Sequence, residues 1–234
     1  MPELGKIILT IIFSIFLVFG IFLLVASIWV KEPYKQSVSL YKGDYYNQPK
    51  FKSVDPIKIY HEALSYAKTG LIDAALDKFK EVIKIIDASF STSPTIKMLK
   101  RDTLYNCGLA NEKLKNYNEA IEYYKESTQV DPNFYKSYCN IGSVYVKKGK
   151  FDLALENLNK ALELNPRDDI AYFNRAIVNN HFGKNKLVVH DLEKFVNYAP
   201  PYHPYINEAK RTIEEIKSLK FDADEIANRL RSIL

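Results

Sequence analysis

The sequence predicts an all-α protein in which an N-terminal transmembrane helix is followed by a solenoid of helix-turn-helix repeats and by C-terminal capping helices. Three observations predict this fold class. An uncharged apolar stretch lies near the N-terminus, small residues and prolines recur every 34 positions from residue 101 onward, and apolar stripes of helical spacing follow the last repeat. Periods of this length are typical of stacked helical hairpins.

Composition and charge exclude several classes of protein. The chain has 234 residues, of which 47% are apolar, and its formal net charge of +5 is a mild excess. A nucleic-acid binder needs a clustered basic face, which this dilute charge does not supply. Two cysteines can form neither a disulfide framework nor a thiolate zinc site. We therefore expect no nucleic-acid partner, no metal and no cofactor.

Residues 1–30 are predicted to form a membrane anchor. Positions 7–30 hold 20 apolar residues among 24 and no charge, which is long enough to cross a bilayer as a helix. Lys6 and Lys31 bracket the stretch, and Trp29 stands where interfacial aromatic residues are expected. The lipid bilayer is thus a predicted partner through residues 7–30. A cleaved signal peptide is the alternative, although the apolar run exceeds the usual core of such peptides.

The orientation of the anchor is ambiguous in the sequence. Lysines after the anchor outnumber Lys6 before it, and the positive-inside rule would then keep the following domain in the cytoplasm. The tail before the anchor is short, however, and large following domains translocate largely regardless of charge. We favour a single-pass inner-membrane protein with a periplasmic body, and the cytoplasmic orientation stays open.

Residues 31–55 are predicted to be a juxtamembrane linker. They hold two prolines, four tyrosines and five lysines without helical or strand periodicity. This composition favours a flexible spacer between the membrane and the body. Docking of its aromatic residues on a partner or on the body is the alternative.

A repeat of 34 residues dominates the chain from residue 101 onward. Prolines, asparagines and small residues recur in one register: Pro132, Pro166 and Pro200; Asn106, Asn140 and Asn174; Gly108, Gly142 and Ala176; Ala120, Ala154 and Val188. A lone hairpin cannot bury its apolar stripe, so several must stack and the ends need caps.

These residues resemble the tetratricopeptide repeat (TPR) family. The copy at 135–168 carries its motif residues: Tyr138, Ile141, Gly142, Tyr145, Ala154, Leu158, Ala161 and Pro166. We assign a TPR domain to 56–202 with four repeats, at 56–89, 101–134, 135–168 and 169–202. An 11-residue insertion separates the first two copies. Within it, Ser93 before Pro94 predicts a capped, early start for the helix that leads to Leu114.

The motif also predicts how the hairpins pack and how the stack ends. Small residues such as Gly142 and Ala154 would lie where two antiparallel helices touch, and a proline would follow each second helix. Residues 203–234 are predicted to form C-terminal capping helices, one beyond Pro204 and another after an N-cap at Asp222. We expect the last helix to pack on the body, with a partner helix or the groove as alternatives.

The predicted functional surface is a partner-binding groove, because the resemblance implies that the first helix of each repeat lines a concave face. The residues assigned to it are Tyr60, Leu64, Tyr105, Asn106, Leu109, Cys139, Asn140, Ser143, Phe173, Asn174 and Ile177. Asparagine amides can bond an extended peptide backbone, and aromatic rims supply contact area. The alternative is that these asparagines only follow the family consensus.

Catalytic motifs are absent from the sequence. It contains no phosphate-binding loop, no zinc-protease motif and no nucleophile elbow, and its four histidines have no partners at ligand spacing. We therefore predict no catalytic residues and no enzyme activity.

The groove favours protein partners of neutral or apolar character. Some TPR domains bind chaperone C-termini through a carboxylate clamp, and Asn106 and Lys136 lie near that pattern. Tyr60 and Leu64, however, replace the lysine and asparagine that the clamp requires. We therefore expect a neutral or apolar peptide segment, or a folded subunit of a membrane complex.

The predicted function is a non-catalytic, membrane-anchored TPR scaffold that mediates protein–protein interactions in a bacterial envelope complex. Its architecture is similar to that of TPR subunits of the periplasmic collar around spirochaete flagellar motors. The alternative is an anchored TPR receptor or chaperone-like accessory for transient protein clients of secretion or import.

Overall fold

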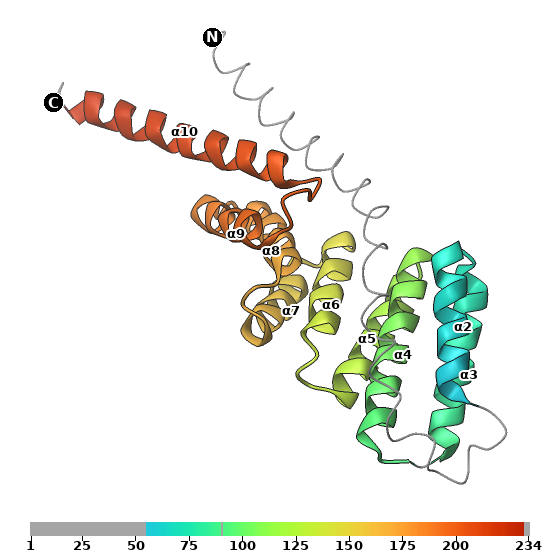
Figure 1. Cartoon of the computed structure of the whole chain (residues 1–234). Helices are drawn as coiled ribbons and strands as arrows, with labels where there is room; N and C mark the ends of the chain where they lie inside the picture. The colour runs from blue at the N-terminus through green and yellow to red at the C-terminus, as the bar shows by residue number, and fades with distance from the viewer. Residues whose placement is uncertain (1–54, 90, 232–234) are drawn as a thin grey trace. The chain divides into compact units, whose positions relative to one another are not determined.

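The computed structural model describes residues 55–89 and 91–231, with side chains described as far as residue 218. Regular secondary structure in this part of the chain is α-helical (Figure 1), which confirms the predicted all-α class. The helices are α2 (Pro56–Thr69), α3 (Ile72–Ser89), α4 (Pro94–Lys113), α5 (Tyr117–Val130), α6 (Tyr135–Lys147), α7 (Phe151–Leu164), α8 (Asp169–His181), α9 (Asn185–Tyr198) and α10 (Ile206–Arg231). Contacts divide the chain into two units, Met1–Asn116 and Tyr117–Leu234, which we describe separately.

The predicted anchor at 1–30 lies outside the described residues, as does the predicted linker as far as residue 54. Among the helices that are described, none is long and apolar enough to cross a membrane. The anchor and the linker therefore stay predictions from the sequence.

Helices α2, α3 and α4 are the described helices of the first unit. Asp55 caps α2, because its carboxylate accepts a hydrogen bond from the N–H of Ile57 at 2.9 Å. Helices α2 and α3 pack as a hairpin, and α4 packs against α3. Ala63 and Ala75, which occupy small-residue positions of the predicted first repeat, are fully buried.

Helix α4 begins at the predicted residue, but the predicted side-chain cap is not formed. The helix begins at Pro94, as early as the Ser93–Pro94 pair predicts. Ser93 occupies the N-cap position, but its side chain makes no capping hydrogen bond, so the prediction of a side-chain cap is wrong. The backbone carbonyl of Ser93 instead accepts the N–H of Lys97 at 2.9 Å. The fixed φ of Pro94 and this backbone bond start the helix without the side chain.

One residue in each hairpin turn has the same left-handed backbone conformation. These residues are Gly70, Lys115, Gly149 and Gly183, with φ of 86°, 64°, 66° and 65°. The last three are spaced by 34, and Gly70 precedes Lys115 by 45, which is one period plus the 11-residue insertion. Glycine is the residue that adopts this conformation without a steric cost. The turns therefore share the register that the repeats predict.

In the second unit, the hairpins α6–α7 and α8–α9 stack through contacts of α8 with α6 and α7. Gly142 lies at the point of closest approach within the first of them. A Cβ atom built on Gly142 would lie 2.6 Å from Cγ of Leu158 and 3.3 Å from the carbonyl oxygen of Ala154. The predicted close contact between Gly142 and the second helix is confirmed.

Residues 206–231 form one continuous helix, α10, which contacts α9. The prediction of two capping helices with a break at Asp222 is therefore wrong, because the backbone is helical through Asp222 (Figure 1). The segment contains neither glycine nor proline, and an aspartate within a helix costs only a fraction of 1 kcal/mol. Ile206, Ala209 and Ile213 are buried, as the predicted apolar stripe requires.

Candidate functional site

The predicted groove residues all lie on first helices of hairpins, but in two separate units. Tyr60 and Leu64 lie on α2, and Tyr105, Asn106 and Leu109 lie on α4. In the second unit, the predicted residues are Cys139, Asn140 and Ser143 on α6 and Phe173, Asn174 and Ile177 on α8. Since α6 contacts α8, the second unit brings six predicted residues onto neighbouring helices.

Most of these side chains are more buried than a groove lining would be. The buried ones are Tyr60, Leu64, Tyr105, Asn106, Cys139, Asn140 and Asn174. Cys139, predicted to face the groove, is only 2% exposed. The half-buried ones are Leu109, Ser143, Phe173 and Ile177. Accessible contact area therefore comes from these four, and three of them lie on α6 and α8.

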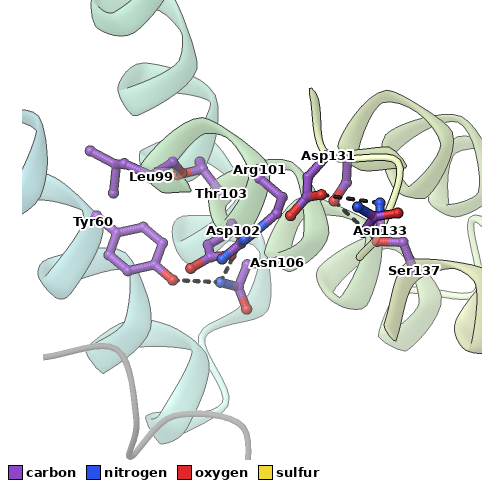
Figure 2. Close-up of polar contacts among 10 residues, drawn as sticks. Tyr60, Leu99, Arg101, Asp102, Thr103, Asn106, Asp131, Asn133 and Ser137 are labelled. Carbon is purple, nitrogen blue, oxygen red and sulfur yellow. Dashed lines mark hydrogen bonds and ion pairs between the residues drawn. The ribbon is translucent and has the colours of Figure 1, made fainter. Parts of the chain in front are cut away.

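The amide of Asn106 is bonded within the first unit. Its Nδ2 donates to the phenol oxygen of Tyr60 and to the backbone carbonyl of Asp102, both at 2.9 Å (Figure 2). Both amide hydrogens are thus used internally, and Tyr60 stands where the carboxylate clamp would need a lysine. The absence of a carboxylate clamp stays a prediction from the sequence.

Asn174, at the same repeat position on α8, differs from Asn106 in its hydrogen bonding. It is 7% exposed, and its side chain makes no hydrogen bond to any described residue. An amide carries two donors and an acceptor. The Asn174 amide is not among the buried polar atoms that lack a partner, so its polar atoms reach the surface and can bond a partner there. Phe173 and Ile177 flank Asn174 on the same helix and are half-buried. This face, defined here as the α6–α8 face, comprises Cys139, Asn140, Ser143, Phe173, Asn174 and Ile177.

One edge of the α6–α8 face is formed by the segment between α9 and α10. The ring of Tyr205 stacks on Phe173 with centroids 5.3 Å apart, and Phe173 also meets Phe195 at 4.9 Å. His203 lies edge-on to Phe195 at 5.0 Å. Among the described residues, the phenol oxygen of Tyr205 is the one buried side-chain polar atom without a hydrogen-bond partner.

Tyr205 and His203 were not predicted as site residues. The signal that could have found them is the proline-rich run from Pro200 to Pro204, which cannot extend α9 and must leave it in an irregular segment. Where such a segment packs depends on contacts with α8, which sequence spacing does not reveal.

Electrostatics at this edge favour neutral groups. Burial raises the pKa of Asp168 to about 6, although the carboxylate accepts the N–H groups of Ile170 and Ala171, both at 3.1 Å. Burial also raises the pKa of Asp169, and it lowers the pKa of His203, which Asp169 partly offsets. Among the described residues no group of three or more potential ligands could hold a metal ion.

Asp168 makes the stability of the second unit depend on pH. Because the folded chain binds this proton more tightly than the unfolded chain, Asp168 destabilises the fold as pH rises from about 4 to about 6. Asp168→Asn keeps an N-cap acceptor and does not titrate. Between pH 4 and pH 6 we expect the Asp168→Asn variant to lose less stability than the wild type. Above pH 6 the variant should be more stable than the wild type by about 1–3 kcal/mol. Urea unfolding at a series of pH values measures both. A variant less stable than the wild type at neutral pH would contradict the burial argument.

The described helices thus define a protein built of stacked helical hairpins. The tetratricopeptide repeat model of the family matches residues 102–134 and 135–168, which are two of the predicted copies. The chain therefore carries tetratricopeptide repeats, as predicted. A solved MamA protein shares the fold, with a TM-score of 0.57 at 21% identity over 75% of this chain and 88% of that one.

Two curated relatives are similar to parts of this chain. The chain is 32% identical over 93 residues to Photosystem I assembly protein Ycf3 of Prochlorococcus marinus (strain MIT 9301), covering 38% of itself and 54% of the relative. It is 22% identical over 166 residues to Hsp70-Hsp90 organizing protein 3 of Arabidopsis thaliana, covering 70% of itself and 29% of the relative. The chain thus spans about half of the first relative and less than a third of the second.

Proposed function

We propose that this protein is a non-catalytic, membrane-anchored scaffold that binds another protein along the α6–α8 face. The observation that carries the proposal is the Asn174 amide, whose polar atoms reach the surface and make no hydrogen bond to described residues, although the residue as a whole is only 7% exposed. The half-buried Phe173 and Ile177 beside it supply apolar area. A partner segment that offers backbone N–H and C=O groups above apolar side chains satisfies both features.

The relatives are consistent with this kind of role. Their names describe an assembly protein and an organizing protein. The anchor rests on the apolar stretch at 7–30, and the inner-membrane location with a periplasmic body rests on the same sequence argument. The envelope complex, including a flagellar-motor collar, is a proposal from composition and architecture.

The proposal predicts that a polar-to-apolar change at Asn174 weakens partner binding without unfolding the protein. Asn174→Leu removes the amide and loses no internal hydrogen bond, so stability should stay close to that of the wild type. Co-purification of the partner after gentle solubilisation of the full chain should fall by at least about tenfold, the effect of losing about 1.4 kcal/mol. Quantitative mass spectrometry of the purified complex measures this ratio.

Asn197→Leu is the matched control, because Asn197 is exposed on α9 and its side chain makes no hydrogen bond to described residues. Equal partner recovery with both variants would contradict the assignment of the α6–α8 face. A stable complex of fixed stoichiometry supports the scaffold, whereas crosslink-dependent capture of varied clients would favour the receptor or chaperone-like alternative.

A further inference from the structure

Two hairpin turns of the second unit meet at one end of the α6–α7 and α8–α9 hairpins. The ring of Phe151, at the start of α7, stacks on His181, at the end of α8, with centroids 3.8 Å apart and planes inclined by 20°. This stacking joins segments 147–153 and 181–187, which together we name the basic tip. Each segment contains a left-handed glycine, Gly149 or Gly183, that reverses the chain.

Large apolar side chains are exposed at the basic tip. Of the five such side chains that are well exposed in the described part of the chain, three lie here, namely Leu153 at 40%, Phe182 at 36% and Leu187 at 47%. Phe182 lies in the turn after α8, and Leu153 and Leu187 lie in the first turns of α7 and α9. Exposed apolar side chains that gather in one place mark a surface that contacts a protein or a membrane.

The charge of the basic tip is one-sided. Its two segments contain five lysines, Lys147, Lys148, Lys150, Lys184 and Lys186, against Asp152 as the single acidic residue. Lys150, Lys184 and Lys186 are exposed and form no ion pair with described residues. The Nζ atom of Lys184 lies 5.0 Å from the centroid of the Phe182 ring, so charge and apolar surface are in contact.

We propose that the basic tip is a docking surface for a bilayer that contains anionic phospholipids. Lysines near such a surface are attracted to the phosphate layer, while neighbouring aromatic and aliphatic side chains enter the headgroup region. Lysines and large apolar side chains are interleaved along both turn segments, which fits an interface that has no fixed partner groups. The inference goes beyond the proposed partner site, since its residues are not those of the α6–α8 face.

The predicted anchor strengthens the argument. If residues 31–55 form the predicted flexible linker, its average span would be about 25–30 Å, so the chain beyond it would be tethered near the membrane and weak lysine contacts would act at high local concentration. The tip would then hold the second unit at the bilayer surface. This step alone depends on the proposed anchoring.

The experiment uses the full chain with vesicles of phosphatidylcholine alone or of equal parts phosphatidylcholine and phosphatidylglycerol. A fluorophore is attached through Leu187→Cys or, as a position control, through Tyr202→Cys, which is 86% exposed and outside the tip. Nitroxide-labelled lipid headgroups quench a fluorophore that reaches the bilayer surface. We expect quenching at position 187 only with phosphatidylglycerol, and its loss in high salt because ions screen the attraction.

Charge variants test the lysines directly. Lys150→Gln, Lys184→Gln and Lys186→Gln together should weaken the phosphatidylglycerol-dependent association by at least about tenfold. The control is a triple variant of the first unit that removes the same number of charges at exposed sites, Lys58→Gln, Lys80→Gln and Lys97→Gln. This variant should leave the phosphatidylglycerol-dependent association nearly unchanged. Equal effects of the two triple variants, or no quenching at position 187, would overturn the proposal.

Two further outcomes separate the alternatives. Binding of the tip to polyglutamate in place of phosphatidylglycerol vesicles would overturn the lipid proposal and assign the surface to an acidic protein. Asn174→Leu should leave the quenching unaltered, so a failure of the partner-binding proposal can be told apart from a failure of the lipid-docking proposal. A chain that does not stay with neutral vesicles refutes the anchor, while its response to phosphatidylglycerol still tests the tip.

Discussion

Asp191→Ala is expected to lower the free energy of unfolding by about 3–5 kcal/mol, because it breaks a buried ion pair. Asp191 on α9 is 1% exposed and accepts two hydrogen bonds from Arg175 on α8, Nε to Oδ2 at 3.0 Å and Nη2 to Oδ1 at 2.7 Å. The amide of Asn179 donates a third at 2.8 Å. Without the carboxylate, the guanidinium keeps its charge with 20% of the side chain exposed. Urea unfolding followed by circular dichroism measures the change.

Glu193→Ala provides the control on the same helix. Glu193 pairs with Lys217 of α10 at 2.9 Å, but both side chains are 51% exposed. Exposed pairs contribute about 0–1 kcal/mol, so this variant should unfold almost like the wild type. Similar losses of stability for Asp191→Ala and Glu193→Ala would mean that burial does not distinguish the two pairs.

Gly142→Val is expected to destabilise the second unit by about 2–3 kcal/mol, because the α6–α7 hairpin has no room for a side chain there. A Cβ atom would already lie 2.6 Å from Cγ and 2.9 Å from Cδ2 of Leu158, whose side chain is fully buried. The intrinsic preference of helices for residues other than glycine acts in the opposite direction but is only about 0.5–1 kcal/mol. Thermal and urea unfolding measure the difference.

Leu158→Ala removes the atoms that Gly142→Val would meet, so the two changes should couple. In the Leu158→Ala background, Gly142→Val is expected to cost less than about half of what it costs in the wild type. Additive costs would show that Leu158 does not set the limit at Gly142, and the close contact of the two helices would then need another explanation.

The sequence predicted the local features of the fold well. Spacing along the chain is enough to identify features that act within one hairpin. These are the small residues Gly142 and Ala154, the prolines that follow α5, α7 and α9, and the early start at Pro94. The break predicted at Asp222 was wrong because an aspartate can cap a helix or lie inside one, and α10 continues through it. Likewise, Ser93 marks the start of α4 without making the capping bond.

The candidate site was less predictable because its properties come from contacts between helices. The repeat pattern assigned Asn106 and Asn174 to one class, yet the first is bonded to Tyr60 and the second has no hydrogen bond to a described residue. Tyr105 and Cys139 are buried by neighbouring elements that the repeat register does not specify. The stacking of Tyr205 on Phe173 joins the segment between α9 and α10 to α8, so no local pattern encodes it.

Site-specific photocrosslinking of the full chain in cells tests the central claim, that the α6–α8 face holds a protein partner. The crosslinker replaces Ile177 on this face or, as a control, Glu193 on α9, and each position is also tested in the Asn174→Leu background. We expect one discrete product from position 177 that depends on Asn174, and none of that size from position 193. No product at position 177, or the same product from both positions, would contradict it.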